Sequence, residues 1–273
     1  MIIHGRITVF GEFLMHTMTE GYIVPAAHAL ATLEEHLLPV HPRYQQMLDQ
    51  VRIHLAERGL PTCSEVRGTL PLGYGFAGST ALALLHLEGN VVGSAGIALA
   101  SAEAIVRQID WQIHGFSPSG VDYHSIVTGK AGYFGPGGWR PVQRRPELAA
   151  SALLVRDPLD WPLSETRCKI VAMADRLIPI ARYLCSVLRA RAILDYQALF
   201  DYSVELRRVN IYAPRATAIV DHALKYGLVA KGVGGLTNKA VIIVWPPEMP
   251  SPVRWRILQE LRSYGVDGAI WQI

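Results

Sequence analysis

A glycine-rich segment in the first third of the chain carries residues that could bind phosphate. Its sequence is Pro71-Leu72-Gly73-Tyr74-Gly75-Phe76-Ala77-Gly78-Ser79-Thr80-Ala81, in which spaced glycines precede a predicted helix whose first turn bears two hydroxyls. Amides at the start of a helix lack intrahelical partners and lie at the positive end of the helix dipole, and glycine lets the main chain approach an anion closely. The pattern is neither a Walker loop nor a dinucleotide fingerprint, and an ordinary strand-to-helix turn capped by Ser79 is the alternative interpretation. The candidate phosphate-binding residues are Gly73, Tyr74, Gly75, Phe76, Ala77, Gly78, Ser79 and Thr80.

Two aspartates flank a turn constrained by proline and glycine, in the segment Asp110-Trp111-Gln112-Ile113-His114-Gly115-Phe116-Ser117-Pro118-Ser119-Gly120-Val121-Asp122. Such carboxylates suit phosphoryl transfer, because one can hold Mg²⁺, which prefers a few oxygen ligands, while the other orients or deprotonates an attacking hydroxyl. Each aspartate also has an ordinary interpretation. Asp110 could be a helix-end acid facing water, and Asp122 could be a turn residue that hydrogen-bonds nearby backbone.

The predicted elements place these segments at the junctions of strands and helices. A strand is expected at residues 5–10, a helix at 42–59, a strand at 64–72 before the glycine loop, and a helix from Ser79 that ends before Gly89. A helix at 95–113 precedes a loop at 116–122, and the glycine-rich stretch 129–138 predicts turns before a domain boundary near residue 150. Beyond the boundary we expect a strand at 153–156, a helix at 164–192 kinked at Pro179, helices at 196–209, 214–227 and 252–264, a turn at 232–235, and strands at 240–245 and 269–273.

Composition excludes several classes of protein. Half of the 273 residues are hydrophobic and 18% are charged, so the chain can bury one large core or two smaller ones. The net charge of +3 is spread along the sequence, so no nucleic-acid partner is expected. Three cysteines fit neither a disulfide framework nor a C-x-x-C metal site, which predicts a reducing compartment, taken to be the cytoplasm. No signal peptide is predicted, and the apolar stretch from Val91 to Val106 is shorter than a membrane span, so no membrane partner is expected.

Taken in order, three segments resemble the signatures of the GHMP kinases, a family named for galactokinase, homoserine kinase, mevalonate kinase and phosphomevalonate kinase. The first is Gly5-Arg6-Ile7-Thr8-Val9-Phe10-Gly11-Glu12, continuing to Gly21-Tyr22-Ile23-Val24-Pro25-Ala26, and the second is the glycine-rich loop described above. The third is Lys231-Gly232-Val233-Gly234-Gly235, which by itself predicts only a β-turn. The pattern formed by His114-Gly115, Pro118-Ser119-Gly120 and Asp122 is similar to that of mevalonate kinases in particular.

The resemblance assigns a role to individual residues. It implies that Asp122 is the catalytic acid-base group, that Asp110 and Ser79 bind Mg²⁺, and that Arg6 is the basic residue of the first signature. We expect Arg6 to meet negative charge on the transferred phosphate and, if it lies beside Asp122, to assist that aspartate. Further substrate contacts are expected from Glu12, His114, Ser119, Gly120, Thr166 and Gly234.

The same resemblance implies the fold and the reaction. The expected fold is α+β with two domains, an N-terminal ribosomal protein S5 domain 2-like domain at 1–150 and a ferredoxin-like C-terminal domain at 151–273, with the active site in the cleft between them. The implied cofactors are ATP and Mg²⁺, and the implied acceptor is a small molecule with a hydroxyl group, mevalonate first. The family also suggests a possible homodimer.

Departures from the family pattern keep alternatives open. Phe13 stands where a histidine is usual, one extra residue lies between Gly115 and Pro118, and Leu236 and Thr237 replace expected glycines. A sugar kinase of the same superfamily, a catalytically silent nucleotide-binding regulator and a decarboxylase of the mevalonate pathway are the competing hypotheses.

Overall fold

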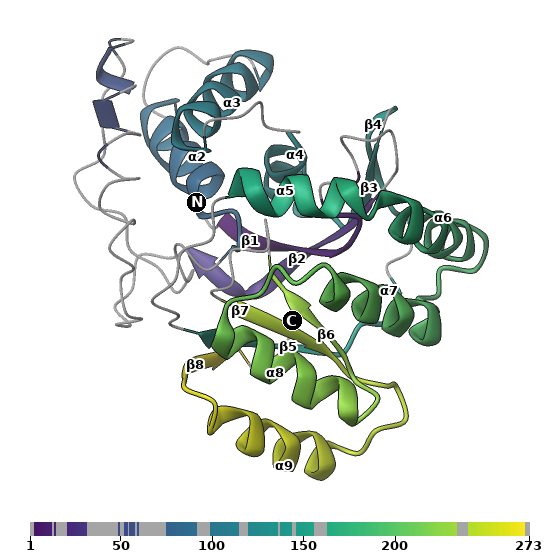
Figure 1. Cartoon of the computed structure of the whole chain (residues 1–273). Helices are drawn as coiled ribbons and strands as arrows, with labels where there is room; N and C mark the ends of the chain where they lie inside the picture. The colour runs from purple at the N-terminus through teal and green to yellow at the C-terminus, as the bar shows by residue number, and fades with distance from the viewer. Residues whose placement is uncertain are drawn as a thin grey trace. The chain divides into compact units, whose positions relative to one another are not determined.

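The computed structural model describes residues 3–12, 14, 21–31, 49, 52–53, 55–57, 59, 75–91, 99–114, 120–135, 137–143, 146–155, 163–233 and 240–270. Helices and two four-stranded sheets make the fold α+β, as predicted (Figure 1). The predicted strand at 64–72 lies outside the described residues, as does most of the predicted helix at 42–59.

The first sheet has the strand order β1-β2-β3-β4. Its strands are β1 (Ile3–Phe10), β2 (Gly21–Ala31), β3 (Gly132–Gly135) and β4 (Gly138–Pro141). Strands β2 and β3 are antiparallel, with Tyr22 opposite Tyr133, and β3 and β4 form a hairpin. The sequence predicted only turns over this hairpin. Its glycine content hid the strands, which gain their stability from pairing with β2 rather than from local preference.

The second sheet has the order β6-β7-β5-β8 and is antiparallel throughout. Its strands are β5 (Ala150–Val155), β6 (Val229–Gly232), β7 (Ala240–Val244) and β8 (Val266–Ile270). Every residue of β5, β6 and β7 is buried. Short continuous apolar runs are typical of strands covered on both faces, and this pattern predicted β7 and the second half of β5.

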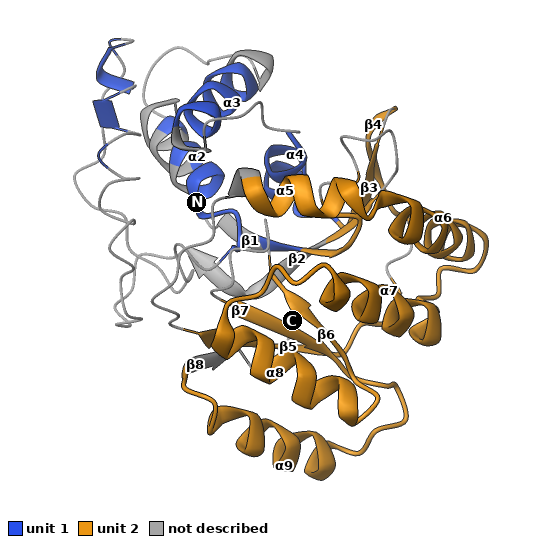
Figure 2. Ribbon diagram, in the orientation of Figure 1, with its two compact units in different colours: residues 1–7, 25–130 blue, residues 8–24, 131–273 orange. Residues whose placement is uncertain are grey.

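The chain divides into two compact units (Figure 2). Unit 1 comprises residues 1–7 and 25–130, and unit 2 comprises residues 8–24 and 131–273. These units are defined by internal packing, and the division into domains 1–150 and 151–273 stays a prediction. Among the described residues, no helix combines the length and apolar character needed to cross a membrane.

The helices of unit 1 are α2 (Gly78–Val91), α3 (Leu99–His114) and α4 (Val121–Thr128). Helix α2 packs on both α3 and α4 and buries Ala81, Leu84 and Leu87. The prediction that α2 ends before Gly89 was wrong, since the helix runs to Val91. The glycine is tolerated there because its cost, about 1 kcal/mol relative to alanine, is small compared with what tertiary packing supplies.

Helix α4 was not predicted, because residues 116–122 were expected to form a loop. Its sequence, VDYHSIVT, is rich in residues of modest helix propensity. Packing compensates, since Val121, Tyr123, Ser125 and Ile126 are buried. The structure therefore places Asp122 in the first turn of a helix rather than in a loop.

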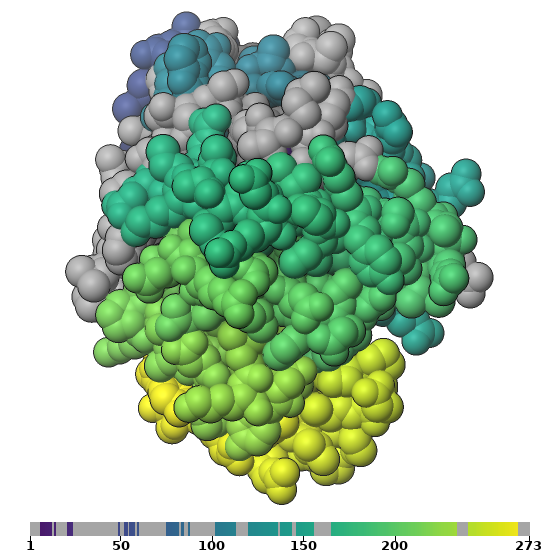
Figure 3. All heavy atoms as spheres, turned by 45° about the vertical axis from the view of Figure 1, so that its right-hand side comes forward, coloured from purple at the N-terminus to yellow at the C-terminus, as the bar shows by residue number. Residues whose placement is uncertain are grey.

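The helices of unit 2 are α5 (Leu163–Ala172), α6 (Ala174–Arg191), α7 (Tyr196–Arg208), α8 (Pro214–Lys225) and α9 (Ser251–Arg262). Helices α7 and α8 pack on β6, and α8 also contacts β7 and α9. Figure 3 shows side chains of these helices, in green to yellow, on the surface of unit 2. The predicted helix at 164–192 is in fact two helices that meet at Met173, while Pro179 lies inside α6.

Candidate active site

The glycine loop leads directly into α2. Gly75 and Ala77 both have positive φ, +89° and +61°, and between them the side chain of Phe76 is completely buried. The backbone N–H of Arg6 in β1 donates to the Phe76 carbonyl at 3.3 Å, which ties β1 to the loop. Gly73 and Tyr74, the first two predicted phosphate-binding residues, lie outside the described residues.

The first turn of α2 presents Gly78, Ser79 and Thr80. Helix α2 has no acidic residue in this turn, so its own sequence leaves the positive end of the dipole available to an anion. Ser79 and Thr80 are nevertheless buried, at 5% and 0% exposure. Their hydroxyls therefore face the interior of unit 1, toward a carboxylate.

That carboxylate is Asp110 on α3, which accepts a hydrogen bond from Thr80 Oγ1 to Oδ2 at 2.6 Å. Burial raises the pKa of Asp110 to about 6, hydrogen bonding by Thr80 lowers this pKa, and the charge of Asp122 raises it. Weaker lowering of the same pKa comes from Ser79 and Arg6. A strongly perturbed acid among other ionisable groups is a common mark of a functional site.

Asp122 forms an ion pair with Arg6, in which Nη2 of the arginine contacts Oδ1 of the aspartate. Arg6 lies on β1 with a side chain that is 9% exposed, whereas the Asp122 side chain is 25% exposed. The position of Asp122 in the first turn of α4 also suits its negative charge. Unit 1 therefore brings together Arg6, Ser79, Asp110 and Asp122, and Arg6 lies beside Asp122, which was the condition for the assistance suggested from the sequence.

The sequence did not predict a set of charged residues beside the turn at Gly120. Arg107 and Glu103, one turn apart on α3, form an ion pair at 2.8 Å, and Nε2 of His124 on α4 lies 3.3 Å from the same glutamate. Gly120 has a φ of +75°, and a Cβ at this position would overlap the Arg107 guanidinium. The i,i+4 spacing of Glu103 and Arg107 was the available signal. These contacts lie beside Gly120, the residue that precedes α4 and the Asp122 in its first turn.

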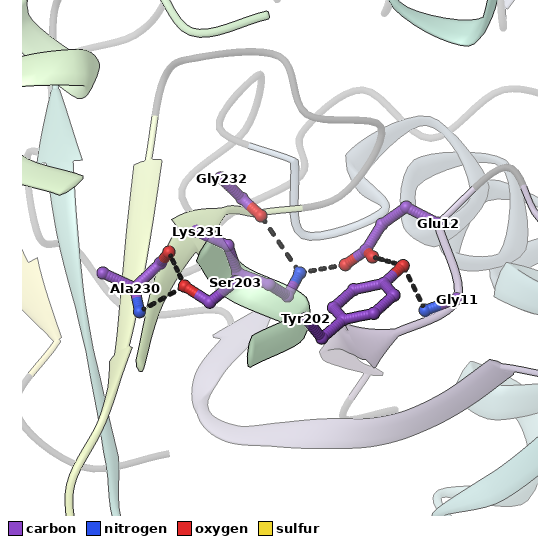
Figure 4. Close-up of polar contacts among 7 residues, drawn as sticks. All are labelled: Gly11, Glu12, Tyr202, Ser203, Ala230, Lys231 and Gly232. Carbon is purple, nitrogen blue, oxygen red and sulfur yellow. Dashed lines mark hydrogen bonds and ion pairs between the residues drawn. The ribbon is translucent and has the colours of Figure 1, made fainter. Parts of the chain in front are cut away.

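The other predicted substrate residues belong to several elements of the two units. His114 is the last residue of α3, Thr166 is buried on α5 at 1% exposure, and Ser119 and Gly234 lie outside the described residues. Glu12 is buried at 2% exposure in unit 2, where it pairs with Lys231 and Tyr202 (Figure 4).

The site in unit 1 fits the chemistry of a magnesium nucleotide. Mg²⁺ is bound through few protein oxygens together with phosphate and water, and Asp110 with Ser79 supplies such a donor set, without nitrogen or sulfur. In the part of the chain that the structure describes, no group of three or more His, Cys, Asp or Glu residues could hold a metal by itself. A site in which phosphate oxygens also bind the metal does not require such a group of side chains.

Comparison with known proteins defines the fold. No protein-family model and no curated protein matches the sequence. Among solved structures, mevalonate kinase from Methanococcus jannaschii is similar with a TM-score of 0.74 and 12% identity, covering 100% of this chain and 98% of that one.

Two further solved structures are similar over the whole of this chain. Streptococcus pneumoniae phosphomevalonate kinase in complex with phosphomevalonate and AMPPNP gives a TM-score of 0.67 and 11% identity, covering 100% of this chain and 99% of that one. Lactococcus lactis galactokinase complexed with galactose gives a TM-score of 0.68 and 12% identity, covering 100% of this chain and 92% of that one. The resemblance read from the three sequence signatures is therefore confirmed at the level of structure, and this chain has the fold of the GHMP kinases.

Proposed function

We propose that this protein is an ATP-dependent phosphotransferase that moves the terminal phosphate of ATP to the hydroxyl of a small molecule, with mevalonate as the first candidate. The observation that carries the proposal is the cluster in unit 1. There the Arg6–Asp122 ion pair lies within electrostatic reach of Asp110, a buried acid held by Thr80 at the start of α2. Such an arrangement offers a base, a cation and a magnesium ligand beside a helix N-terminus, which are the parts that phosphoryl transfer requires.

In the proposed reaction, the amides of Gly78 and Ser79 hold the nucleotide phosphates. Asp110 and Ser79 would hold Mg²⁺, which when bound neutralises charge on the phosphate oxygens. Asp122 accepts the proton of the acceptor hydroxyl as the hydroxyl oxygen attacks the terminal phosphorus of ATP, while the bond from that phosphorus to the bridging oxygen breaks and ADP leaves. Arg6 fixes the Asp122 carboxylate and provides positive charge near the transferred group. Because the transition state is loose, positioning and charge neutralisation supply most of the rate.

Two features favour mevalonate as the acceptor. The first is the His114-Gly115, Pro118–Gly120 and Asp122 pattern, which resembles that of mevalonate kinases. The second is the structural similarity to a mevalonate kinase, whose TM-score of 0.74 is the highest of the three structures compared. The galactokinase has a TM-score of 0.68 over the same share of this chain. Arg6, which resembles the basic residue of galactokinases, favours a sugar acceptor as the second candidate.

The test is coupled ADP release with Mg·ATP against mevalonate, phosphomevalonate and a panel of hexoses. Release that depends on one acceptor identifies the branch of the family. Nucleotide binding without release for any acceptor would contradict the proposal and support the silent regulator. Carbon dioxide release together with phosphate would identify the decarboxylase.

A further inference from the structure

A buried ion pair in unit 2 joins two segments that are more than two hundred residues apart in the sequence. Nζ of Lys231 contacts Oε1 of Glu12, and each side chain is only 2% exposed. Lys231 Nζ also donates to the carbonyl oxygen of Gly232 at 3.2 Å. A buried ion pair is stable only when its geometry and additional hydrogen bonds offset the loss of hydration.

Tyr202 on α7 supplies such hydrogen bonds. Its hydroxyl accepts from the backbone N–H of Gly11 at 2.9 Å and donates to Oε2 of Glu12 at 3.2 Å. Burial and the charge of Glu12 hold the Tyr202 pKa well above its usual value, so the hydroxyl remains a donor to the carboxylate. The backbone of Gly11 is thereby connected through three side chains to the backbone of Gly232 (Figure 4).

The next residue of α7, Ser203, hydrogen-bonds to the backbone of β6. Its Oγ donates to the Ala230 carbonyl at 2.6 Å and accepts from the Ala230 N–H at 3.1 Å. Consecutive residues of one helix therefore fix Gly11–Glu12 on one side and β6 on the other (Figure 4). We call Glu12, Tyr202, Ser203 and Lys231 the α7 network.

The α7 network joins the two segments that the sequence singled out for their resemblance to the first and third signatures. Gly11 and Glu12 directly follow β1, the strand that carries Arg6. Lys231 and Gly232 end β6, where the third signature begins. Each of the two charges has a partner of opposite sign inside the network.

We propose that Glu12, Tyr202 and Lys231 are positioning residues, which hold the ends of β1 and β6 in register with each other for the phosphoryl transfer proposed above. Glu12 thus takes this role in place of the substrate contact expected from the sequence. The catalytic consequence rests on the proposed function, while the coupling between the two segments does not. Buried charged groups that fix one arrangement of the backbone are an attested use of such pairs.

Tyr196 provides a matched control on the same helix. Its hydroxyl donates to the Val244 carbonyl at 3.1 Å and accepts from the Val229 N–H at 3.2 Å, so it anchors the other end of β6 without touching Glu12. Tyr196→Phe and Tyr202→Phe remove the same atom from the same helix. If the Tyr202 hydroxyl only anchors the segment that it contacts, Tyr202→Phe should affect residues 11–12 alone, as Tyr196→Phe should affect β6 alone.

The experiment is hydrogen–deuterium exchange on the full chain, comparing wild type, Tyr202→Phe, Tyr196→Phe and Lys231→Met. Tyr202→Phe is expected to speed exchange by about tenfold or more in both residues 9–12 and residues 231–233. Lys231→Met is expected to speed exchange at residues 9–12, across the network, whereas Tyr196→Phe affects β6 alone. Effects of Tyr202→Phe or Lys231→Met that stay within one segment would overturn the proposal.

Kinetics adds the catalytic part of the test. With an active acceptor, Tyr202→Phe should lower kcat by about tenfold and leave the KM for ATP within about twofold, while Tyr196→Phe changes neither. Equal loss of kcat in both variants would overturn the positioning role. If the wild type releases no ADP with any acceptor, the proposed function fails, and the exchange experiment still decides the coupling.

Discussion

Two buried carboxylates, one in each unit, are stabilised in different ways. Glu12 in unit 2 is paired with a lysine and receives a tyrosine hydrogen bond, so its charge is matched within the fold. Asp110 in unit 1 is also buried but is held mainly by the Thr80 hydroxyl, with the like charge of Asp122 nearby. The fold compensates the first charge and leaves the second largely uncompensated.

The difference separates residues that position the fold from residues that are available for chemistry. When the pKa of a buried acid is raised, its ionised form is destabilised by burial, and a cation bound beside it would stabilise that form. A bound Mg²⁺ would therefore stabilise the ionised form of Asp110, whereas the ionised form of Glu12 is already stabilised by Lys231. Removing the lysine beside Glu12 should therefore lower the free energy of unfolding, whereas removing the charge of Asp110 should raise it.

The largest effect is expected at the ion pair. Lys231→Met leaves the Glu12 carboxylate buried without its cation and should lower the free energy of unfolding by about 3–5 kcal/mol. The double variant Glu12→Gln/Lys231→Met should recover most of this loss, because no buried charge remains. Urea denaturation followed by circular dichroism measures both. A double variant that is no more stable than Lys231→Met would show that lost packing, rather than the charge, is the cause.

Asp110→Asn should act in the opposite direction on stability. The folded-state pKa of about 6 lies above the ordinary value of 3.8, so the wild type loses stability as pH rises between these values. Measured without Mg²⁺, the variant should be more stable than wild type by about 3 kcal/mol at pH 8 and no more stable at pH 3. Phosphotransfer by the same variant should fall by at least about a hundredfold. A variant that is less stable at pH 8 would contradict the comparison.

Alanine substitution at the two glycines that flank α4 tests the role of the turn before Asp122. Gly120 and Gly129 both have positive φ, but a Cβ at Gly129 would meet nothing within 4 Å, whereas at Gly120 it would displace Arg107. Gly129→Ala should cost about 1 kcal/mol from backbone strain alone. Gly120→Ala should cost about 1–2 kcal/mol more and also lower kcat, because Asp122 lies two residues away. Thermal denaturation and ADP release together distinguish the two, and equal kcat values would contradict this role of the turn.

The smallest effect is expected at Ala77. Its φ of +61° suits glycine better than alanine, so Ala77→Gly relieves strain while increasing the entropy of the unfolded chain. The two terms should leave a net gain of about 0.5 kcal/mol. A clear loss of stability would show that the alanine methyl, which is buried, contributes more through packing than it costs in strain.

The sequence predicted the parts of the site whose chemistry is local. Ser79 and Thr80 could be recognised at the start of a helix because helix starts have short-range signals, whereas the role of Asp110 came from the family resemblance. Strand β7 and the second half of β5 were predictable because a short apolar run is also a local signal. Family resemblance, rather than spacing, suggested that Arg6 and Asp122 belong together.

What the sequence did not reveal depends on contacts between distant residues. Helix α4 and the β3–β4 hairpin are weak local formers that tertiary packing stabilises. The contact of Arg107 with Gly120 and the pairing of Glu12 with Lys231 have no local signature, because the partners lie far apart in the chain. The pairing of Glu12 with Lys231 in particular could not be predicted, because a lone acid in a signature does not reveal its partner.

The central claim is that Asp122 is the base of a phosphotransferase, and it is tested by acceptor-dependent ADP release in Asp122→Asn beside Asp175→Asn. Asp175 is an exposed aspartate of α6 and provides the same chemical change away from the site. Asp122→Asn should lower kcat by about 10²–10⁴-fold while Asp175→Asn retains wild-type turnover. Wild-type turnover in Asp122→Asn, with both variants folded, would contradict the account.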